Sequence, residues 1–502
     1  MATSTTTDSA ATATDYELVI GLEVHAQLRT QSKMFCGCSS DYANAAPNSH
    51  CCPICMGYPG VLPVINSEAI DKTIMTALAL NCEIPEFSKF DRKNYGYPDL
   101  PKGYQISQYD RPLSRDGFLT VEVNGEQRRI GITRVHLEED TGRLLHRNEA
   151  GASFTLVDLN RAGVPLMEIV GEPDIRSAEE ARLYMEKLRQ ILLYLGVSSG
   201  RMEEGALRCD ANVSVRPRGS SEFGVKTEIK NMNSFRAVER AIAYEAQRQI
   251  EILRSGGTIE QETRGWVEDK GITVSQRSKE YAQDYRYFPE PDLPPLVVSR
   301  EWVERIRAQM PELPDARRER FERAYSLAHK DAVALTAERE LADYYEDVLR
   351  AGNGTGAAGT PERAKTAANW VLGDLRRLLN AEGLEITASR VKPGDLAALL
   401  AMLDAGKISG KQAKDVLEKA FAGGESPAAI VEREGIAQLA DTAALERVVD
   451  EVIAENPKAV EDYQTGKTAA VQFLVGQVMK RTKGSAKPDI VRPILLGKLG
   501  QP

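Results

Sequence analysis

The sequence lacks any long hydrophobic run, and this absence excludes one broad class of protein. No segment approaches the roughly 20 consecutive apolar residues that a membrane-spanning helix needs, so we expect no membrane association. Residues 1–14 contain no lysine or arginine and no apolar core, which excludes a secretory signal or a transit peptide. We therefore expect a cytoplasmic protein with a disordered tail over residues 1–15.

Conventional nucleotide-binding and hydrolytic motifs are also missing. Gly466, Lys467 and Thr468 imitate the end of a phosphate-binding loop, but Glu461 stands where the first glycine of that loop is required. No glycine-rich turn follows the strand-like run 16–24, which excludes a Rossmann fingerprint, and no Gly-x-Ser-x-Gly motif offers a serine nucleophile. If this protein uses ammonia, another protein must generate it.

Cysteine is scarce, with seven in 502 residues, yet four of them have the spacing of a metal site. Cys36 and Cys38 form one close pair, and Cys52 and Cys55 form a second. Two short loops that each supply two sulfurs suit tetrahedral Zn²⁺. Cys51 adjoins the second pair, and we expect it to be a bystander beside the ligand Cys52. The alternative is a set of reduced thiols without a metal, and both interpretations fit a reducing compartment.

Composition and charge are those of a globular protein with several domains. Hydrophobic residues make up 42% of the chain and charged residues 27%, and the net charge of −9 argues against indiscriminate binding of nucleic acid. Cations are nevertheless concentrated near the C-terminus, at Lys480, Arg481, Lys483 and Lys487. Such a group favours contact with an RNA backbone, or it stabilises the C-terminal end of a helix.

The periodicity of residues 16–300 predicts a mixed α and β domain. Ser177 and Glu180 form a capping box before an apolar stripe of helical spacing, which predicts a helix over about 177–196, and a second helix is expected over 235–253. Runs rich in β-formers alternate with turn residues elsewhere in this domain. The expected strands include 16–24, 118–123, 127–137, 154–159 and 209–215.

Helical periodicity dominates the rest of the chain. The proline-rich segment 287–295 closes the mixed domain, since proline removes amide donors and restricts the residue before it. Loops at 351–360 and 422–427 then interrupt Ala-, Leu- and Glu-rich helical sequence. We expect a helical domain over 301–427 and a terminal helical module over 428–502.

Acidic residues on strand-like segments of the mixed domain are candidate metal ligands. Glu23 and His25 are two residues apart, so the alternation of a strand puts both on one face, where they can reach one ion. Glu138, Glu139 and Asp140 are adjacent like charges, which repel one another unless they are hydrated or bind a cation. Carboxylate ligands suit Mg²⁺, which a site handling ATP requires. Any one of these acids alone is more often a solvated or ion-paired residue.

Cations of the same domain form two groups. Lys226 and Lys230 flank Glu228 on one strand face, which suits the clamping of a phosphate between carboxylates, and suits equally a ladder of ion pairs between strands. Arg277 and Lys279 form the second group. These four cations are our candidate nucleotide contacts.

Long, ordered motifs resemble one known family along nearly the whole chain. They lie at 21–25, the four cysteines, 97–108, 136–140, 158–166, 202–214, 226–236, 284–296 and 456–463. The family is GatB, the B subunits of the tRNA-dependent amidotransferases called GatCAB.

The resemblance implies an α+β fold class. It implies a cradle domain related to glutamine synthetase, then an all-α helical domain and a YqeY-like helical tail. The cradle would be a ligase that uses ATP and Mg²⁺ to phosphorylate the side chain of Glu on tRNA(Gln), or of Asp on tRNA(Asn). Ammonia from an amidase subunit, GatA, would then displace the phosphate, and GatC would be a small third subunit.

Carried onto matching positions, the resemblance implies that Glu23, His25 and Glu138 hold Mg²⁺, with Glu168 and Asp210 as further catalytic candidates. The C-terminal cations would contact the body of the tRNA. Two other functions stay open at this point. One is a non-catalytic, zinc-containing subunit that binds RNA, and the other is an amidoligase that works alone with free ammonia.

Overall fold

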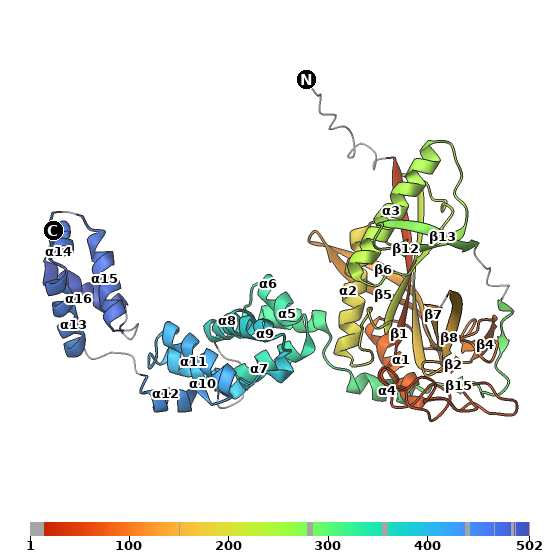
Figure 1. Cartoon of the computed structure of the whole chain (residues 1–502), viewed down its shortest axis with the longest axis horizontal. Coiled ribbons are helices and arrows are strands. Elements are labelled where there is room, and N and C mark those ends of the chain that lie inside the picture. Colours follow the sequence, from red (N-terminus) through yellow and green to blue (C-terminus); the bar gives the residue numbers. More distant parts are fainter. Residues whose placement is uncertain are drawn as a thin grey trace, which may run out of the picture. The chain divides into compact units, whose positions relative to one another are not determined.

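The chain folds into two compact units, divided in sequence between Leu313 and Pro314. The computed structural model describes residues 15–149, 151–278, 285–353, 360–436, 442–465, 467–482, 486 and 488–500. The first unit mixes strands and helices, and the second is helical (Figure 1). Among the described helices, none is both long and apolar enough to cross a membrane. The predicted tail, 1–15, lies outside the described residues except for Asp15.

An eight-stranded sheet forms the centre of the first unit. Its order is β13-β12-β11-β10-β1-β9-β6-β5, and every neighbouring pair is antiparallel except β11 with β12. Four of the expected strands are confirmed as β1, β5, β6 and β10. The strands are β1 (Tyr16–Gln27), β5 (Ser114–Val123), β6 (Glu126–Glu139), β9 (Pro165–Gly171), β10 (Leu207–Pro217), β11 (Thr227–Lys230), β12 (Glu262–Val267) and β13 (Ile272–Ser278).

The two faces of this sheet differ in chemistry. Helices α1 (Ser67–Ala79), α2 (Ala178–Tyr194) and α3 (Phe235–Arg254) pack against it, on β6, β5 and β10 respectively (Figure 1). In β1 the alternate side chains Leu22 and Val24 are buried in the core with these helices. The residues between them therefore point to the other face of the sheet, which carries the polar groups described below.

Both helices expected in the mixed domain are confirmed as α2 and α3. Ser177 caps α2 by accepting a hydrogen bond from the Glu180 amide at 3.0 Å. The Glu180 carboxylate accepts from the Arg176 amide instead of the Ser177 amide, so the box is displaced by one residue. The cap nevertheless satisfies two amides that have no partner within the helix.

Two short strands near the end of the first unit pair with strands from its first third. β14 (Phe288–Pro289) and β4 (Tyr104–Ser107) flank β3 (Asp91–Asn94), and β15 (Leu296–Val297) pairs with β2 (Phe87–Ser88). The proline-rich segment 287–295 thus contributes the edge strand β14. Helix α4 (Arg300–Gln309) follows, and its buried Ile306 joins the core of the first unit. This packing explains why the unit extends beyond the predicted boundary at 300, to Leu313.

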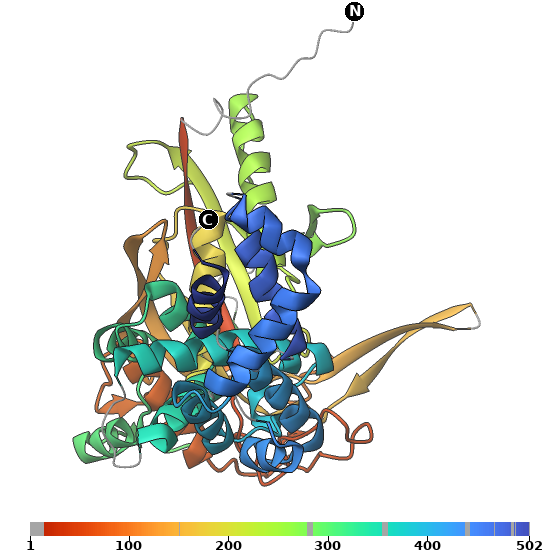
Figure 2. The ribbon, with the colours of Figure 1, turned by 90° about the vertical axis from the view of Figure 1, so that its left-hand side faces the viewer.

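A two-stranded hairpin, β7 (Arg143–Glu149) and β8 (Ala152–Asp158), interrupts the chain between β6 and β9. β8 confirms the strand expected at 154–159. These two strands pair only with each other among the described strands. Figure 2 shows the hairpin, in gold, extending away from the rest of the first unit.

The helices of the second unit form two hydrophobic clusters. One contains buried residues from Phe321 to Ile430, and the other contains buried residues from Leu445 to Leu499. Because Ile430 of α12 belongs to the first cluster, that cluster extends past the predicted boundary at 427. Part of the predicted loop 351–360 is helical at the end of α7, Thr360 caps α8, and 354–359 lie outside the described residues.

The elements of this unit are α5 (Pro314–Tyr325), α6 (His329–Leu335), α7 (Arg339–Asn353), α8 (Pro361–Asn369), the π-helix η2 (Trp370–Leu375), α9 (Arg376–Glu382), the 3₁₀-helix η3 (Ile386–Ala388), α10 (Pro393–Asp404), α11 (Gly410–Gly423), α12 (Pro427–Glu434), α13 (Thr442–Glu455), α14 (Pro457–Gln464), α15 (Ala470–Arg481) and α16 (Pro488–Leu499).

Candidate active site and cysteine cluster

Three side chains form a row across the polar face of the sheet. His25 on β1 lies directly opposite Glu168 on β9, and Glu168 lies opposite His136 on β6. His25 Nε2 is 3.5 Å from Glu168 Oε2, and His136 Nε2 is 3.3 Å from the same oxygen. The register of three antiparallel strands therefore gathers groups that are more than a hundred residues apart in sequence.

Glu138 completes this group from the same strand face as His136, two residues along β6. Its Oε1 is 3.6 Å from His25 Nε2, and its other oxygen accepts a hydrogen bond from Ser107. One ligand atom each of His25, Glu138 and Glu168 lie within 4.8 Å of one another. Two carboxylates with one imidazole fit a hard divalent cation such as Mg²⁺ or Mn²⁺.

A polar cavity of about 460 Å³ surrounds the group. Acids and Lys230 line one side, from β1, β10 and β11, and Lys93 with several tyrosines lines another, from the region of β3, β4 and β14. Glu23, His25, Glu138, Glu168, Asp210 and Lys230 all contribute to its wall. Every residue that we predicted to be catalytic therefore faces this cavity.

Glu23 and Asp210 line the same cavity as this group of three residues. They face one another in the pairing of β1 with β10, and Glu23 accepts a hydrogen bond of 2.8 Å from Asn212. Lys230 makes ion pairs with Asp210 and Glu228. Burial disfavours the charged lysine, but these two carboxylates outweigh that effect and raise the pKa of Lys230. Lys230 is thus both a member of an ion-pair ladder and a cation of the cavity.

The acids at 138–140 turn to different surroundings. Glu138 faces the cavity, whereas Glu139 projects to the opposite face of β6 and pairs with Lys102. Asp140 lies beyond the strand, where it also lines the cavity and accepts a hydrogen bond of 3.0 Å from Arg208. Burial raises the pKa of Asp140, but Arg208 and a second arginine lower it more. Each of the three acids therefore has its own partner, and Glu138 is the one that belongs to the group with His25 and Glu168.

Electrostatic coupling between His25 and Glu168 favours the ionised form of each. Burial lowers the pKa of His25, but the hydrogen bond to Glu168 and the charges of Glu168, Glu138 and Asp210 outweigh it, so the pKa is raised. Burial also favours neutral Glu168, but the charge of His136 and hydrogen bonds from both histidines hold its pKa well below the usual range. Protons therefore compete with a divalent cation for the His25 ring more strongly than they do for an ordinary histidine.

The structure adds residues that the sequence analysis did not nominate. His136 belongs to the row. It precedes Glu138 by two residues, and this spacing, which puts both side chains on one face of a strand, could have identified it from the sequence. The Lys93 ammonium lies 5.2 Å from the centre of the Tyr285 ring, and no ion pair or hydrogen bond of that ammonium occurs within the described ranges. Burial lowers the pKa of Lys93, but Glu138 and other anions raise it above the usual value. Nothing local in the sequence distinguishes this lysine.

Among the other predicted nucleotide contacts, Lys226 has a described side chain, and it does not line the cavity. Lys226 is exposed and precedes β11. Arg277 belongs to β13, and its side chain lies outside what is described, as does the whole of Lys279. Lys230 is the one member of the predicted set that the described residues bring to the site.

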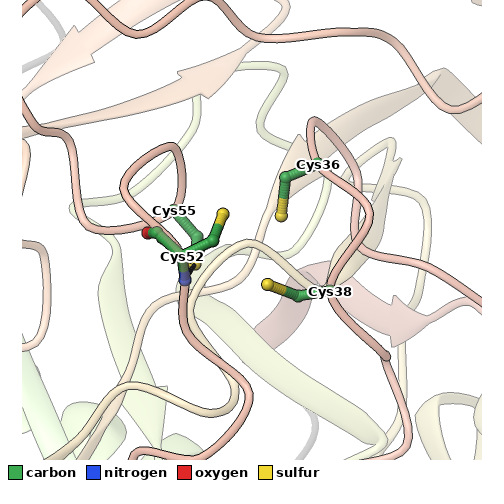
Figure 3. A group of neighbouring side chains, drawn as sticks. All are labelled: Cys36, Cys38, Cys52 and Cys55. Carbon is green, nitrogen blue, oxygen red and sulfur yellow. Dashed lines mark hydrogen bonds between the residues drawn. The ribbon is translucent and has the colours of Figure 1, made fainter.

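The four predicted cysteine ligands meet in space. Cys36 and Cys38 project from one loop towards Cys52 and Cys55 on another, as Figure 3 shows. All four sulfurs lie within 4.8 Å of one another, and those of Cys52 and Cys55 are 3.8 Å apart. A ZnS₄ tetrahedron with bonds of about 2.3 Å has edges of about 3.8 Å. The cluster fits a metal ion, and Cys51 is not part of it.

A buried lysine supports the cysteine cluster. Lys33 is fully buried, and its ammonium donates to the carbonyl oxygens of His50 at 2.7 Å and Leu159 at 3.3 Å. It also lies 3.8 Å from the Cys55 sulfur. A hydrogen bond from Cys36 and the charge of Lys33 help to lower the pKa of Cys55 to about 4, although burial opposes this. Cys55 therefore favours thiolate, which is the form that binds metal, whereas burial and a hydrogen bond with Cys52 raise the pKa of Cys38 to about 11.

The predicted RNA-binding cations are partly described. Lys480 on α15 is exposed, and no ion pair of it occurs within the described ranges. Arg481 pairs with Glu451 and Glu455. Lys483 and Lys487 lie outside the described residues.

Comparisons with known proteins agree with this geometry. Residues 18–304 match the GatB/GatE catalytic domain, and residues 355–499 match the GatB domain. The chain is 58% identical to the B subunit of the aspartyl/glutamyl-tRNA(Asn/Gln) amidotransferase of Carboxydothermus hydrogenoformans, over 97% of this chain and 99% of that protein. It is 56% identical to the protein of the same name from Moorella thermoacetica, over 97% of this chain and 100% of that protein. The chain therefore belongs to the GatB family of amidotransferase B subunits.

Proposed function

We propose that the cavity phosphorylates the side-chain carboxylate of Glu or Asp on a misacylated tRNA and then converts it to the amide. The observation that carries this proposal is the group of His25, Glu138 and Glu168 inside a polar cavity that also holds Lys93 and Lys230. Transfer of a phosphoryl group needs a divalent cation and positive charge around the phosphate. The names of the relatives supply the substrate, an aspartyl- or glutamyl-tRNA.

The residues of the cavity have distinct roles in this proposal. His25, Glu138 and Glu168 would hold Mg²⁺, with Glu23 and Asp210 as further ligands through their place in the wall. When bound, Mg²⁺ neutralises the charge on the phosphate oxygens. Lys93 and Lys230 are cations in a buried setting, where they attract phosphate oxygens more strongly than in water.

The reaction has two balanced steps. A carboxylate oxygen attacks the terminal phosphorus of ATP, and ADP leaves, so an acyl phosphate forms on the tRNA-linked amino acid. Ammonia then attacks the carbonyl carbon, the bond to the phosphate oxygen breaks, and inorganic phosphate and one proton leave. No Gly-x-Ser-x-Gly motif occurs in the chain, and the thiols at 36–55 fit a metal. We therefore assign the supply of ammonia to an amidase subunit, GatA, which with GatC completes the enzyme.

The rest of the chain supports this chemistry in the proposal. The first unit is a cradle of the glutamine synthetase type, the cysteine cluster is a structural Zn²⁺ site, and the terminal helices form a YqeY-like tail that contacts tRNA through its cations. The alternative, a zinc-containing subunit without catalysis, does not account for the polar cavity. Burial of carboxylates and histidines costs free energy, and a purely structural role does not explain that cost.

The test is amidation by the reconstituted complex. Glu-tRNA(Gln) and Asp-tRNA(Asn) are supplied in turn with ATP, Mg²⁺ and glutamine, and the amide product and ADP are measured together. We expect ADP release to depend on the misacylated tRNA and to match the amide formed. Amide formation without ATP, or ADP release that ignores the aminoacyl group, would contradict the proposal.

A further inference from the structure

The lysine and arginine side chains of the catalytic cavity differ in whether a carboxylate neutralises them. Among the described residues these side chains are Lys93, Arg134, Arg208 and Lys230. Arg208 pairs with Asp140, and Lys230 pairs with Asp210. The side chain of Arg134 makes no ion pair and no hydrogen bond within the described ranges. Arg134 therefore brings to the cavity a positive charge that no described carboxylate neutralises.

The strand pairing explains why Arg134 has no partner. It reaches the cavity from β6 by the same alternation that places His136 and Glu138 there. The residues directly opposite it are Val170 on β9 and Arg115 on β5, so neither neighbouring strand offers an anion at that position. Its Nε is buried and finds no hydrogen-bond acceptor among the described residues. Burial of an unsatisfied charged group costs free energy, which a bound anion in the cavity would recover.

We infer that Arg134 binds phosphate oxygens of ATP beside the group of His25, Glu138 and Glu168. This inference rests on the proposed function. A guanidinium presents a planar fork of N–H donors, which fits two oxygens of one phosphate. Arg134 is two residues from His136, which itself lies 3.3 Å from Glu168. A triphosphate that is bound to a metal ion at this group therefore has a second cation along the same strand.

The attacking carboxylate of the aminoacyl group is the less suitable anion for Arg134. Its oxygen donates an electron pair to phosphorus, and a guanidinium bound to that carboxylate would withdraw electron density from the nucleophile. On phosphate oxygens the same cation neutralises the negative charge that repels the attack. Arg134 thus joins Lys93, which also has no ion pair within the described ranges, on the nucleotide side of the reaction.

The test measures binding and stability in the reconstituted complex. Arg134→Met removes the charge and keeps an unbranched side chain. We expect its Kd for the Mg²⁺ complex of an ATP analogue with an imido group between the β- and γ-phosphates to rise by roughly ten- to a hundredfold, which corresponds to the loss of charge-assisted hydrogen bonds. Its Kd for misacylated tRNA should stay within about twofold of the parent. Because Arg134 has no described partner in the fold, the melting temperature should not fall.

Two further variants complete the test. Arg134→Lys keeps the charge but not the fork, so we expect a smaller rise in the Kd for the analogue, and this variant carries the test if Arg134→Met does not fold. Arg115→Met is the matched control, because it removes the same charge at the position directly opposite on β5. Arg115 is exposed and pairs with Glu83, so its loss should leave the Kd for the analogue within about twofold of the parent.

The outcomes separate the possible roles of Arg134. A Kd for the analogue within about twofold of the parent in Arg134→Met overturns the inference. A rise in the Kd for tRNA alone also overturns it and assigns Arg134 to a phosphate of the tRNA. A rise in both constants with a lower melting temperature assigns a structural role and overturns it as well. Failure of the proposed function looks different, because the parent complex itself then does not bind the analogue, and both proposals fall.

Discussion

Neighbouring acids on β6 offer a sharp test of the catalytic assignment. Glu138 and Glu139 are both buried, but alternation sends the first into the cavity and the second to the other face of the strand. Glu138→Gln keeps the size of the side chain and removes one of the two negative charges in the group with His25 and Glu168. We expect this variant to lose amidation while it keeps its fold.

The distance within the group sets the magnitude. A bound cation 3.6 Å from the Glu138 carboxylate, which is the distance between His25 and Glu138, would interact with it by about 5 kcal/mol per unit charge at an effective dielectric constant of about 20. After a discount for desolvation, a loss of about 3–4 kcal/mol corresponds to a rate on the order of 10²–10³ lower. Amidation of labelled Glu-tRNA(Gln) with ammonium chloride measures this rate without any contribution from the amidase.

Glu139→Gln is the matched control for the same chemical change. It leaves Lys102 buried without its partner, so we expect a loss of about 3 kcal/mol in the free energy of unfolding. Its rate at a temperature where it is folded should stay within about threefold of the parent. The reasoning is refuted if Glu138→Gln retains a rate within threefold of the parent, or if Glu139→Gln loses the larger share of activity.

Three further predictions follow from the same geometry. Because the pKa of His25 is raised, protons compete with the metal ion for its ring. The apparent affinity for Mg²⁺ should therefore rise as the pH passes through that pKa and then level off. In His25→Asn the apparent affinity for Mg²⁺ should depend less on pH. Cys52→Ser should lose bound zinc by metal analysis whereas Cys51→Ser keeps it, and equal retention would contradict the ligand set. Lys480→Ala should reduce the salt dependence of tRNA binding by about one counterion, and an unchanged slope would remove this residue from the RNA contact.

Local patterns predicted much of the fold. Apolar spacing and the Ser177 cap identify α2, and alternation identifies β1, because both depend on residues close in sequence. The cysteine set was also predictable, since two short loops carry it. The predicted boundaries at 300 and at 427 stay predictions. At each of them the next helix packs on the preceding core, which is a contact that periodicity does not report.

Some residues of the candidate site could be predicted from local sequence patterns, and others could not. Alternation placed Glu23 and His25 on one face, and the structure agrees that both line the cavity. It did not indicate that Glu168 and His136 form a row with His25, because strand register depends on pairing between distant segments. Lys93 was missed for a related reason, since it reaches the cavity from a short strand outside the main sheet.

The sequence by itself determined the family, the succession of a mixed unit and a helical unit, the four cysteines that cluster and the acids that line the cavity. These properties reside in residue types and in spacings along a few turns or strands. Only the tertiary structure decided that Glu138 joins His25 and Glu168 while Glu139 pairs with Lys102 and Asp140 with Arg208, that His136 and Lys93 line the same cavity, and that a hairpin is inserted between β6 and β9. The physical reason is that each of these facts depends on which distant strands pair and in what register, and that is set by burial of the whole core.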